Sequence, residues 1–143
     1  MHQNIQSVGN KQTEVDLALK LNLNNTDILC FTEYWLKEDY LKLIYLDQYK
    51  LVSYFSRKNH NHGGSSIFVR KNICTRELNC CQDISVEKDC EVSMTELVDC
   101  GYIVVCIYRS PDGKFWIFLK NLELIIQKIQ SRNKNLHYMV TGT

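Results

Sequence analysis

The stretch DILCFTEYWL, residues 27–36, decides the fold class of this chain. Its first six residues, 27–32, form a continuous apolar run between turn residues, which predicts a strand buried on both faces. A second run of the same kind, YIVVCIY, occupies residues 102–108. Polar residues follow each run directly. Buried strands that end in polar residues are typical of α/β folds, in which ligands bind beyond the carboxyl ends of the strands.

The rest of the chain predicts helices interleaved with strands in one domain. A helix is expected over residues 11–21, capped by Asn10, with Val15, Ala18, Leu19 and Asn22 on one face. A short helix is expected over 38–46, and the strongest over 115–131, with an apolar stripe of Phe115, Phe118, Leu119, Leu122, Ile125, Ile126 and Ile129. Further strands are expected at 49–55 and 65–70, which form a hairpin, and at 90–97 and 136–140. Residues 72–89 predict loop or edge strand.

Composition narrows the class of protein. The 143 residues suffice for one domain, and the net charge of +1 gives no strong positive field for nucleic acid. No apolar run approaches the roughly 20 residues of a membrane helix, so we expect no membrane association. The seven cysteines are an odd number without a C-x-x-C pair, and Cys30 and Cys106 lie inside apolar runs. We therefore expect free thiols in an intracellular, reducing compartment.

Polar residues at the ends of the predicted strands could carry chemistry. Asn4, Glu33, Tyr108 and Arg109 all hold such positions. Mg²⁺ takes oxygen ligands, usually one or two protein carboxylates completed by water and phosphate, so Glu33 with Asn4 fits its needs. Tyr108 or Arg109 could then hold a phosphate oxygen. The alternative is that all four are solvated loop residues.

Two other groups of residues favour simpler interpretations. The loop RKNHNHGG, residues 57–64, carries His60 and His62, but no third ligand accompanies them, so we expect a solvated loop. The aromatic residues Tyr34, Trp35, Phe115 and Trp116 predict core packing rather than base stacking.

The order of motifs resembles a known family. HQNIQS at residues 2–7 with Lys11, DILCFTEYWL at 27–36, GGSSIFVR at 63–70 and YRSP at 108–111 are similar to the endonuclease domain of non-LTR (LINE-type) retrotransposons, a member of the endonuclease/exonuclease/phosphatase superfamily. The resemblance implies a four-layer α/β sandwich and Mg²⁺-dependent nicking of DNA in the nucleus, with no small-molecule cofactor. It implies that Asn4 orients the metal or nucleophile, that Glu33 is the principal Mg²⁺ ligand and that Tyr108 contacts the scissile phosphate, with Arg109 a weaker candidate.

The chain departs from the family pattern at its last residues. The family continues Gly-Asp-Phe-Asn where this chain has Gly142-Thr143, and a Ser-Asp-His motif belongs to the half of the domain that would follow. We therefore expect residues 1–143 to be a truncated sandwich, the N-terminal half to two-thirds of the domain, with Thr143 in place of the aspartate, weak Mg²⁺ binding and little nuclease activity. A non-catalytic DNA- or protein-binding module, or a phosphoesterase of the same superfamily, is the alternative.

The resemblance also implies a geometry. Asn4, Glu33 and Tyr108 should meet at one end of a sheet, and the helix that begins at Phe115 should pack on that same sheet. This helix should deliver the last strand beside the strand that ends at Glu33. A truncated sandwich should also leave one sheet face uncovered, as an exposed apolar patch.

Overall fold

Two four-stranded sheets face one another in the computed structural model, which describes residues 1–22, 25–81, 83–132 and 137–143 apart from the side chains at positions 10, 19, 22 and 81. The first sheet has the order β1-β2-β4-β3, formed by β1 (His2–Asn4), β2 (Ile28–Thr32), β4 (Ser65–Arg70) and β3 (Tyr49–Phe55). The second has the order β5-β6-β7-β8, formed by β5 (Thr75–Glu77), β6 (Glu91–Leu97), β7 (Tyr102–Tyr108) and β8 (His137–Gly142). The pairs β1–β2 and β7–β8 are parallel, and the other pairs are antiparallel.

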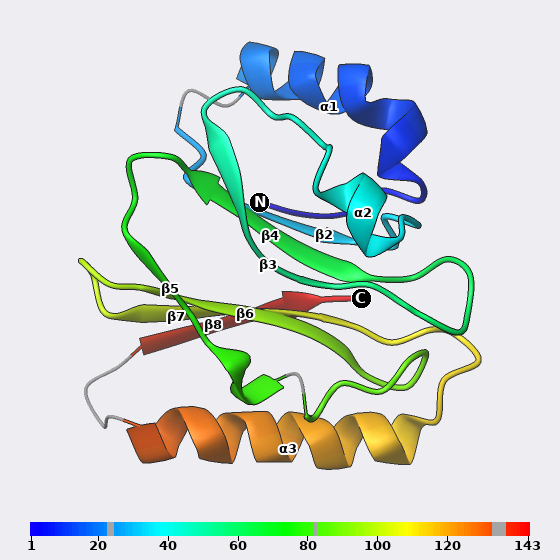
Figure 1. Ribbon diagram of the computed structural model, residues 1–143. Helices are drawn as coiled ribbons and strands as arrows, with labels where there is room; N and C mark the ends of the chain where they lie inside the picture. Colours follow the sequence, from blue (N-terminus) through cyan, green and yellow to red (C-terminus); the bar gives the residue numbers. More distant parts are fainter. Residues whose placement is uncertain (23–24, 82, 133–136) are drawn as a thin grey trace.

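Helices cover the outer faces of both sheets. Figure 1 shows α1 (Val8–Asn22) and the short α2 (Glu38–Leu41) on the first sheet and α3 (Phe115–Arg132) on the second. A single turn of 3-10 helix, Asn79–Cys81, precedes β6. The order of layers is therefore helix, sheet, sheet, helix, and the expected α/β sandwich is confirmed. None of the helices in the described part of the chain is long and apolar enough to cross a membrane.

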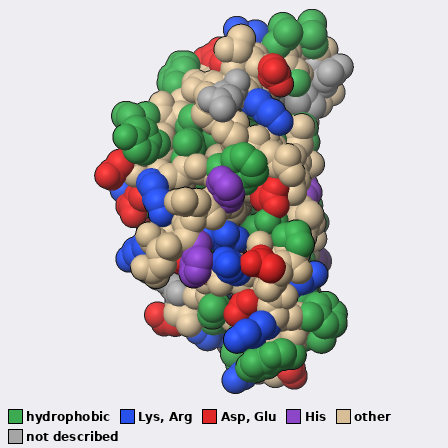
Figure 2. Space-filling view, turned by 90° about the vertical axis from the view of Figure 1, so that its right-hand side faces the viewer, with side chains coloured by type: hydrophobic (Ala, Val, Ile, Leu, Met, Phe, Trp, Pro, Cys, Tyr) green, Lys and Arg blue, Asp and Glu red, His purple; other side chains and the backbone are tan. Residues whose placement is uncertain are grey.

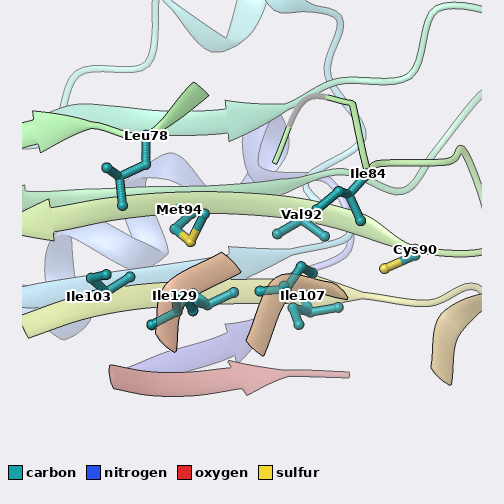
Figure 3. Close-up of a cluster of buried hydrophobic side chains, with 10 residues drawn as sticks. Leu78, Ile84, Cys90, Val92, Met94, Ile103, Ile107 and Ile129 are labelled. Carbon is teal, nitrogen blue, oxygen red and sulfur yellow. The ribbon is translucent and has the colours of Figure 1, made fainter. Parts of the chain in front are cut away.

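Three clusters of buried side chains hold the layers together. One lies between the two sheets and contains Cys30, Ile67, Val69, Leu97, Val104 and Cys106. A second lies under α1 and α2 and includes Leu29, Phe31, Leu41 and Phe68. The third joins α3 to the second sheet, where Ile129 lies over Ile103, Ile107 and Met94 (Figure 3). At about 25 cal/mol per Å² of buried apolar surface, these contacts are the main source of stability.

Most strands lie where the sequence predicts them. The bounds of β3, β4 and β7 equal the predicted ranges, and β3 pairs with β4 as the expected hairpin. Position 136, the predicted start of the last strand, lies outside the described residues, and β8 continues to Gly142. Within residues 72–89 the short β5 is an edge strand, as one of the two alternatives had it. The six cysteines whose side chains are described are free thiols, as expected.

The two N-terminal helices differ from the prediction. α1 begins at Val8, so Asn10 lies inside the helix and is not its cap. The amides of Ser7 and Val8 instead donate to the carbonyl oxygens of Glu33 and Tyr34, so the backbone after β2 satisfies the helix start. Val15 is buried as predicted, Ala18 is exposed, and the side chains at positions 19 and 22 lie outside the description.

The second predicted helix, 38–46, ends at Leu41. Leu41 and Leu46 are both buried in the cluster under α1. Five residues apart, they would point away from each other by about 140° on a continuous helix with 3.6 residues per turn, so the chain must leave the helix to bury both.

α3 extends over the predicted range, but its location corrects two expectations. It packs on the second sheet, away from the sheet that carries Glu33, and β8 pairs with β7 instead of β2. A helix that connects two parallel strands returns the chain to the sheet it left, which explains both facts. Of the predicted stripe, Ile125 and Ile129 are buried, whereas Phe115 and Leu119 are exposed.

The expected uncovered sheet face is also wrong, because both sheets form within these residues and each carries a helix. The exposed apolar side chains of the C-terminal part lie elsewhere, on β8 and on the outer side of α3: Tyr138, Met139, Val140, Phe115, Trp116, Leu119 and Leu124. β8 is the edge of its sheet and contains no Lys, Arg, Asp, Glu or Pro.

Candidate active site

Four strands end on the same side of the sandwich and bring the predicted site residues to one place. Parallel pairing sets the end of β1 beside the end of β2, with Asn4 opposite Thr32, and the end of β8 beside the end of β7. Figure 1 shows β8 and the C-terminus at the side where the β3–β4 loop lies, and Figure 2 looks onto that side. Asn4, Glu33, Tyr108 and Thr143 therefore all lie at this end.

The contact between Glu33 and Tyr108 joins the two sheets. The Tyr108 hydroxyl donates a short hydrogen bond to Glu33 Oε1. Tyr108 is buried, and burial together with the Glu33 carboxylate raises its pKa, so the hydroxyl keeps its proton at neutral pH. Glu33 is half-buried and has left-handed backbone, with φ of 57°. A carboxylate is thus fixed where a strand from each sheet ends.

The residue before Glu33, Thr32, brings a hydroxyl group to this end of the sandwich. Thr32 is fully buried, and its Oγ1 is 3.2 Å from Thr143 Oγ1 and 3.3 Å from His2 Nε2. Burial, and then the nearby N-terminal charge, lowers the pKa of His2. Asn4 is exposed and, two residues after His2 on β1, lies on the same face of the strand. The side-chain amide of Asn4 is therefore on the side of the strand that faces Thr32.

The end of β8 is fixed by its backbone. The amide of Thr143 donates to Ile107 O at 3.1 Å, and the amide of Arg109 donates to Thr143 O at 2.9 Å. At Gly142 the two strands are so close that a Cβ would overlap the Ile107 carbonyl oxygen. Thr143 thus lies beside Tyr108, and only glycine fits before it.

Arg109 has contacts different from those of a free phosphate ligand. Its Nη1 donates to the carbonyl oxygens of Ser110 and Gly113, at 3.2 and 3.0 Å, and its guanidinium lies 5.6 Å from the centre of the Phe115 ring. These contacts tie the turn after β7 to the start of α3.

A buried ion pair that the sequence did not reveal supports the site. Arg57, at the end of β3, donates from Nε to Glu91 Oε1 in a short contact, and both side chains are almost fully buried. The other carboxylate oxygen of Glu91 accepts from the amide of Gly64 at 2.6 Å. The Arg57 guanidinium also lies 5.9 Å from the centre of the Tyr108 ring. The pair therefore connects the first sheet to the second directly behind Tyr108.

The β3–β4 loop, residues 56–64, is exposed at its tip but tied down on two sides. Lys37 Nζ donates to the carbonyl oxygens of Arg57, Lys58 and His60 at 3.0 to 3.2 Å. On the other side the Glu87 carboxylate accepts the amides of Lys58, Asn59 and His60 and contacts His60 Nδ1 at 2.6 Å. Burial of Glu87 opposes its ionised form, but His60 and these amides outweigh it and lower its pKa to about 2. The expectation of a solvated loop is therefore only partly right, because the tip is exposed but the backbone is bound on two sides.

The aromatic residues do not all follow the prediction. Tyr34 is buried in the core as expected, with its hydroxyl bonded to Phe55 O. Trp35, in contrast, is 38% exposed, and its ring lies against that of His62, with centroids 4.2 Å apart. Phe115 and Trp116 are exposed as well. The core prediction is thus wrong for three of these rings: Trp35 lies in the segment after β2, and Phe115 and Trp116 lie in the first turn of α3.

The donors at this end are the oxygen atoms that a hard cation prefers. They are the carboxylate of Glu33, the amide oxygen of Asn4 and the hydroxyls of Thr32 and Thr143. Within the described part of the chain, no three His, Cys, Asp or Glu side chains gather as a metal site would require. The donor set thus suits Mg²⁺ in kind, with a single carboxylate.

A cavity of about 690 Å³ lies apart from this end, between β3, β5 and α2. Its lining includes Lys42, Tyr54 and Leu78 and none of the predicted site residues. The side chains that could take part in chemistry lie at the strand ends and not in this cavity.

Comparisons with known proteins place the fold. No family model and no curated protein matches the chain. Several solved structures match the chain. The endonuclease domain of TRAS1, a telomere-specific non-LTR retrotransposon, matches with a TM-score of 0.60 at 12% identity, and an endonuclease/exonuclease/phosphatase family protein from Bacteroides thetaiotaomicron with a TM-score of 0.62 at 14%. A 3′ phosphatase from Neisseria bound to a DNA hairpin product matches with a TM-score of 0.56 at 17%.

Each match includes 99% of this chain but only 55% to 61% of the other. The chain thus spans little more than half the length of the structures it resembles. At identities this low, the structural matches establish the fold and leave the activity open. The two helix-covered sheets and these matches together show that the chain has the fold of the endonuclease/exonuclease/phosphatase superfamily.

Proposed function

We propose that the chain forms the first part of a Mg²⁺-dependent DNA endonuclease domain of the non-LTR retrotransposon kind. The observation that carries the proposal is the hydrogen bond from Tyr108 to Glu33, which fixes a carboxylate where strands of both sheets end. The motifs around these two residues and the likeness to the TRAS1 domain support the same activity.

The proposed roles follow from the donors at this end. Glu33, with the amide oxygen of Asn4, would hold Mg²⁺, which when bound would neutralise negative charge on a phosphodiester. Tyr108 keeps its proton, so its hydroxyl would serve as a hydrogen-bond donor to a phosphate oxygen. Nicking of chromosomal DNA would place the protein in the nucleus.

We also propose that these 143 residues alone cleave DNA poorly. Glu33 is the one carboxylate side chain among the described donors of this end, and the position beside Tyr108, directly after β8, holds Thr143, whose side chain is uncharged. Loss of a general base alone typically costs about 10²- to 10⁴-fold in rate. Cation binding should accordingly be weak.

Plasmid nicking and metal titration test the two parts of this proposal. The chain and its Glu33→Gln variant would be incubated with supercoiled plasmid and Mg²⁺, and titrated with Mg²⁺ and Mn²⁺ by calorimetry. Weak binding that Glu33→Gln abolishes, without efficient nicking, is expected. Efficient nicking that depends on Glu33 would contradict the proposed inactivity, and binding unaffected by Glu33→Gln would contradict the metal site.

A phosphomonoesterase is the second candidate, because two of the similar structures are described as phosphatases, one from Neisseria and a mannosyl-6-phosphatase from Bacteroides thetaiotaomicron. Glu33-dependent turnover of a phosphomonoester, in the absence of nicking, would favour it.

A further inference from the structure

An aromatic platform formed by Trp35 and His62 lies beside the candidate active site. The ring centroids are 4.2 Å apart with 32° between the planes, and both side chains are exposed. The amide of Trp35 donates to Gly63 O at 3.1 Å, and the amide of Glu33 donates to Gly64 O at 3.0 Å. The platform and the site carboxylate are therefore held by the same two glycines.

The backbone at the platform is locally strained. Glu33, Trp35 and His62 have φ angles of 57°, 60° and 65°, the left-handed region that side chains other than glycine rarely occupy. Each such residue costs on the order of 1–3 kcal/mol, and such residues cluster at functional sites. A tryptophan that remains exposed in this conformation contributes little to the core, so its packing does not explain the strain.

The platform is also pre-organised. His62 belongs to the loop that Lys37 and Glu87 tie down from opposite sides, and Arg57 Nη1 adds a bond to the carbonyl oxygen of Asn61 at 3.1 Å. A ring held in place loses little conformational entropy when a second ring stacks on it. Figure 2 shows histidine side chains next to hydrophobic, basic and acidic ones near the middle of this face.

We propose that the Trp35–His62 platform binds an unpaired nucleobase next to the phosphate that Glu33 and Tyr108 address. The inference rests on the proposed function, since it places the platform on the strand that is cut. Two residues span at most about 7 Å of backbone, so the Trp35 backbone lies close to that of Glu33. Every base presents a π face to an indole, which makes such stacking tolerant of sequence. The exposed Lys58 in the same loop is available for the adjoining phosphates.

Fluorescence of Trp35 can report this binding directly. The chain has two tryptophans, and replacing the other one by Trp116→Phe, on the exposed side of α3, leaves Trp35 as the only indole. This protein would be titrated with a short single-stranded oligothymidylate and, separately, with an oligonucleotide of the same length made only of abasic sites. The two probes carry equal phosphate charge and differ only in their bases. Chelator keeps divalent cations out, so cleavage plays no part.

We expect oligothymidylate to quench Trp35 and to bind about tenfold more tightly than the abasic strand, since stacking of one base supports roughly that factor. In Trp35→Leu, whose binding is measured by fluorescence anisotropy of labelled strands, the affinities for oligothymidylate and for the abasic strand should lie within about twofold of each other. Trp35→Phe, which keeps a ring, should retain most of the preference. Equal binding of the two labelled strands by the parent protein, measured by fluorescence anisotropy, or no binding of either, would overturn the proposal, and this comparison needs no variant that has to fold.

The test separates the platform from the proposed function. A protein that prefers the base-bearing strand but shows no Glu33-dependent metal binding retains the platform and loses the nuclease proposal. A protein that binds metal through Glu33 but does not distinguish the two strands retains the nuclease proposal and loses the platform. A duplex of the same sequence should bind more weakly than the single strand, and equal or tighter duplex binding would contradict the requirement for an unpaired base.

Discussion

At the scale of single residues, one hydrogen bond joins the two sheets at the end where the candidate site lies. The Tyr108 hydroxyl donates to Glu33 from the other sheet, and Thr143, directly after β8, lies beside Tyr108 with a side-chain hydroxyl and no side-chain charge. A hydroxyl is a weak ligand for a cation that gives up its water reluctantly. On the proposed metal-binding role of this end, the identity of residue 143 would limit the affinity for the cation.

Replacing this hydroxyl by a carboxylate should strengthen cation binding. In Thr143→Asp a second negative charge would lie near Glu33, and we expect Mn²⁺ to bind up to about tenfold more tightly, equivalent to about 1.4 kcal/mol. Calorimetry at low ionic strength measures the change. Thr141→Asp, two residues earlier and on β8, is the matched control and should change affinity little. An equal gain in both variants would mean that general attraction, and not coordination at this end, is responsible.

At the scale of elements, the close approach of β8 to β7 depends on a glycine. In Gly142→Ala the new Cβ would overlap Ile107 O, so the last residues of β8 must move away from β7. We expect the free energy of unfolding to fall by about 1–2 kcal/mol and the amides of Arg109 and Thr143 to exchange hydrogen faster, because both bond across this junction. Urea titration and hydrogen exchange measure the two effects.

Gly9→Ala is the control for that experiment. Gly9 lies in α1, where an added Cβ would make an ordinary contact of 3.4 Å with Leu36, and alanine favours a helix over glycine. This variant should be as stable as the parent or slightly more stable. Equal destabilisation by the two changes would show that the glycine at 142 is not required by strand spacing.

The β3–β4 loop should make stability depend on acid pH. The contacts of Glu87 with His60 and the loop amides lower its pKa from 4.5 to about 2 in the folded protein. Its contribution to the free energy of unfolding is therefore complete above about pH 4.5 and is lost as pH falls toward 2. Because its partner His60 is half-exposed and solvent screens the pair, we expect about 1 kcal/mol. Glu87→Gln should therefore be less stable than the parent near neutral pH, and the difference should vanish near pH 2. A difference that persists at pH 2 would point to packing instead of charge.

The elements that the sequence predicted well are those set by local pattern. The bounds of β3, β4 and β7 follow from alternation or from a continuous apolar run between turn residues. The start of α1 could not be read in this way, since backbone carbonyls from the distant β2 end take the place of a side-chain cap. The Arg57–Glu91 pair was equally hidden, because 34 positions separate its members and Glu91 belongs to an alternating strand. The local sequence pattern predicted where strands end, whereas the start of α1 and the Arg57–Glu91 pair depend on contacts between residues far apart in the sequence.

At the scale of the whole molecule, the Arg57–Glu91 pair joins the two sheets and should show strong coupling. Arg57→Met leaves a buried carboxylate unpaired, and Glu91→Leu leaves a buried guanidinium unpaired, each at a cost of about 3–5 kcal/mol. The double variant should be much more stable than the sum of the two costs implies, with a coupling of about 2 kcal/mol or more in a urea-based cycle.

The exposed pair of Glu38, on α2, and Lys42, directly after it, is the matched control for this cycle. It has the same charges and a short contact but lies in solvent, so its cycle should give no measurable coupling. Additive costs at Arg57 and Glu91 would mean that the two side chains stabilise the sandwich independently.

The placement of β1 and β8 has a consequence for the order in which the molecule forms and opens. Both are edge strands, they face each other across the sandwich, and each has a long connection to its parallel neighbour. Antiparallel hairpins close quickly, whereas parallel pairs wait for their connecting segments, so these two strands should dock last. Edge strands also open most readily. Asn4 lies on β1 and Thr143 directly follows β8, so the site can come apart by fraying while the sandwich stays folded.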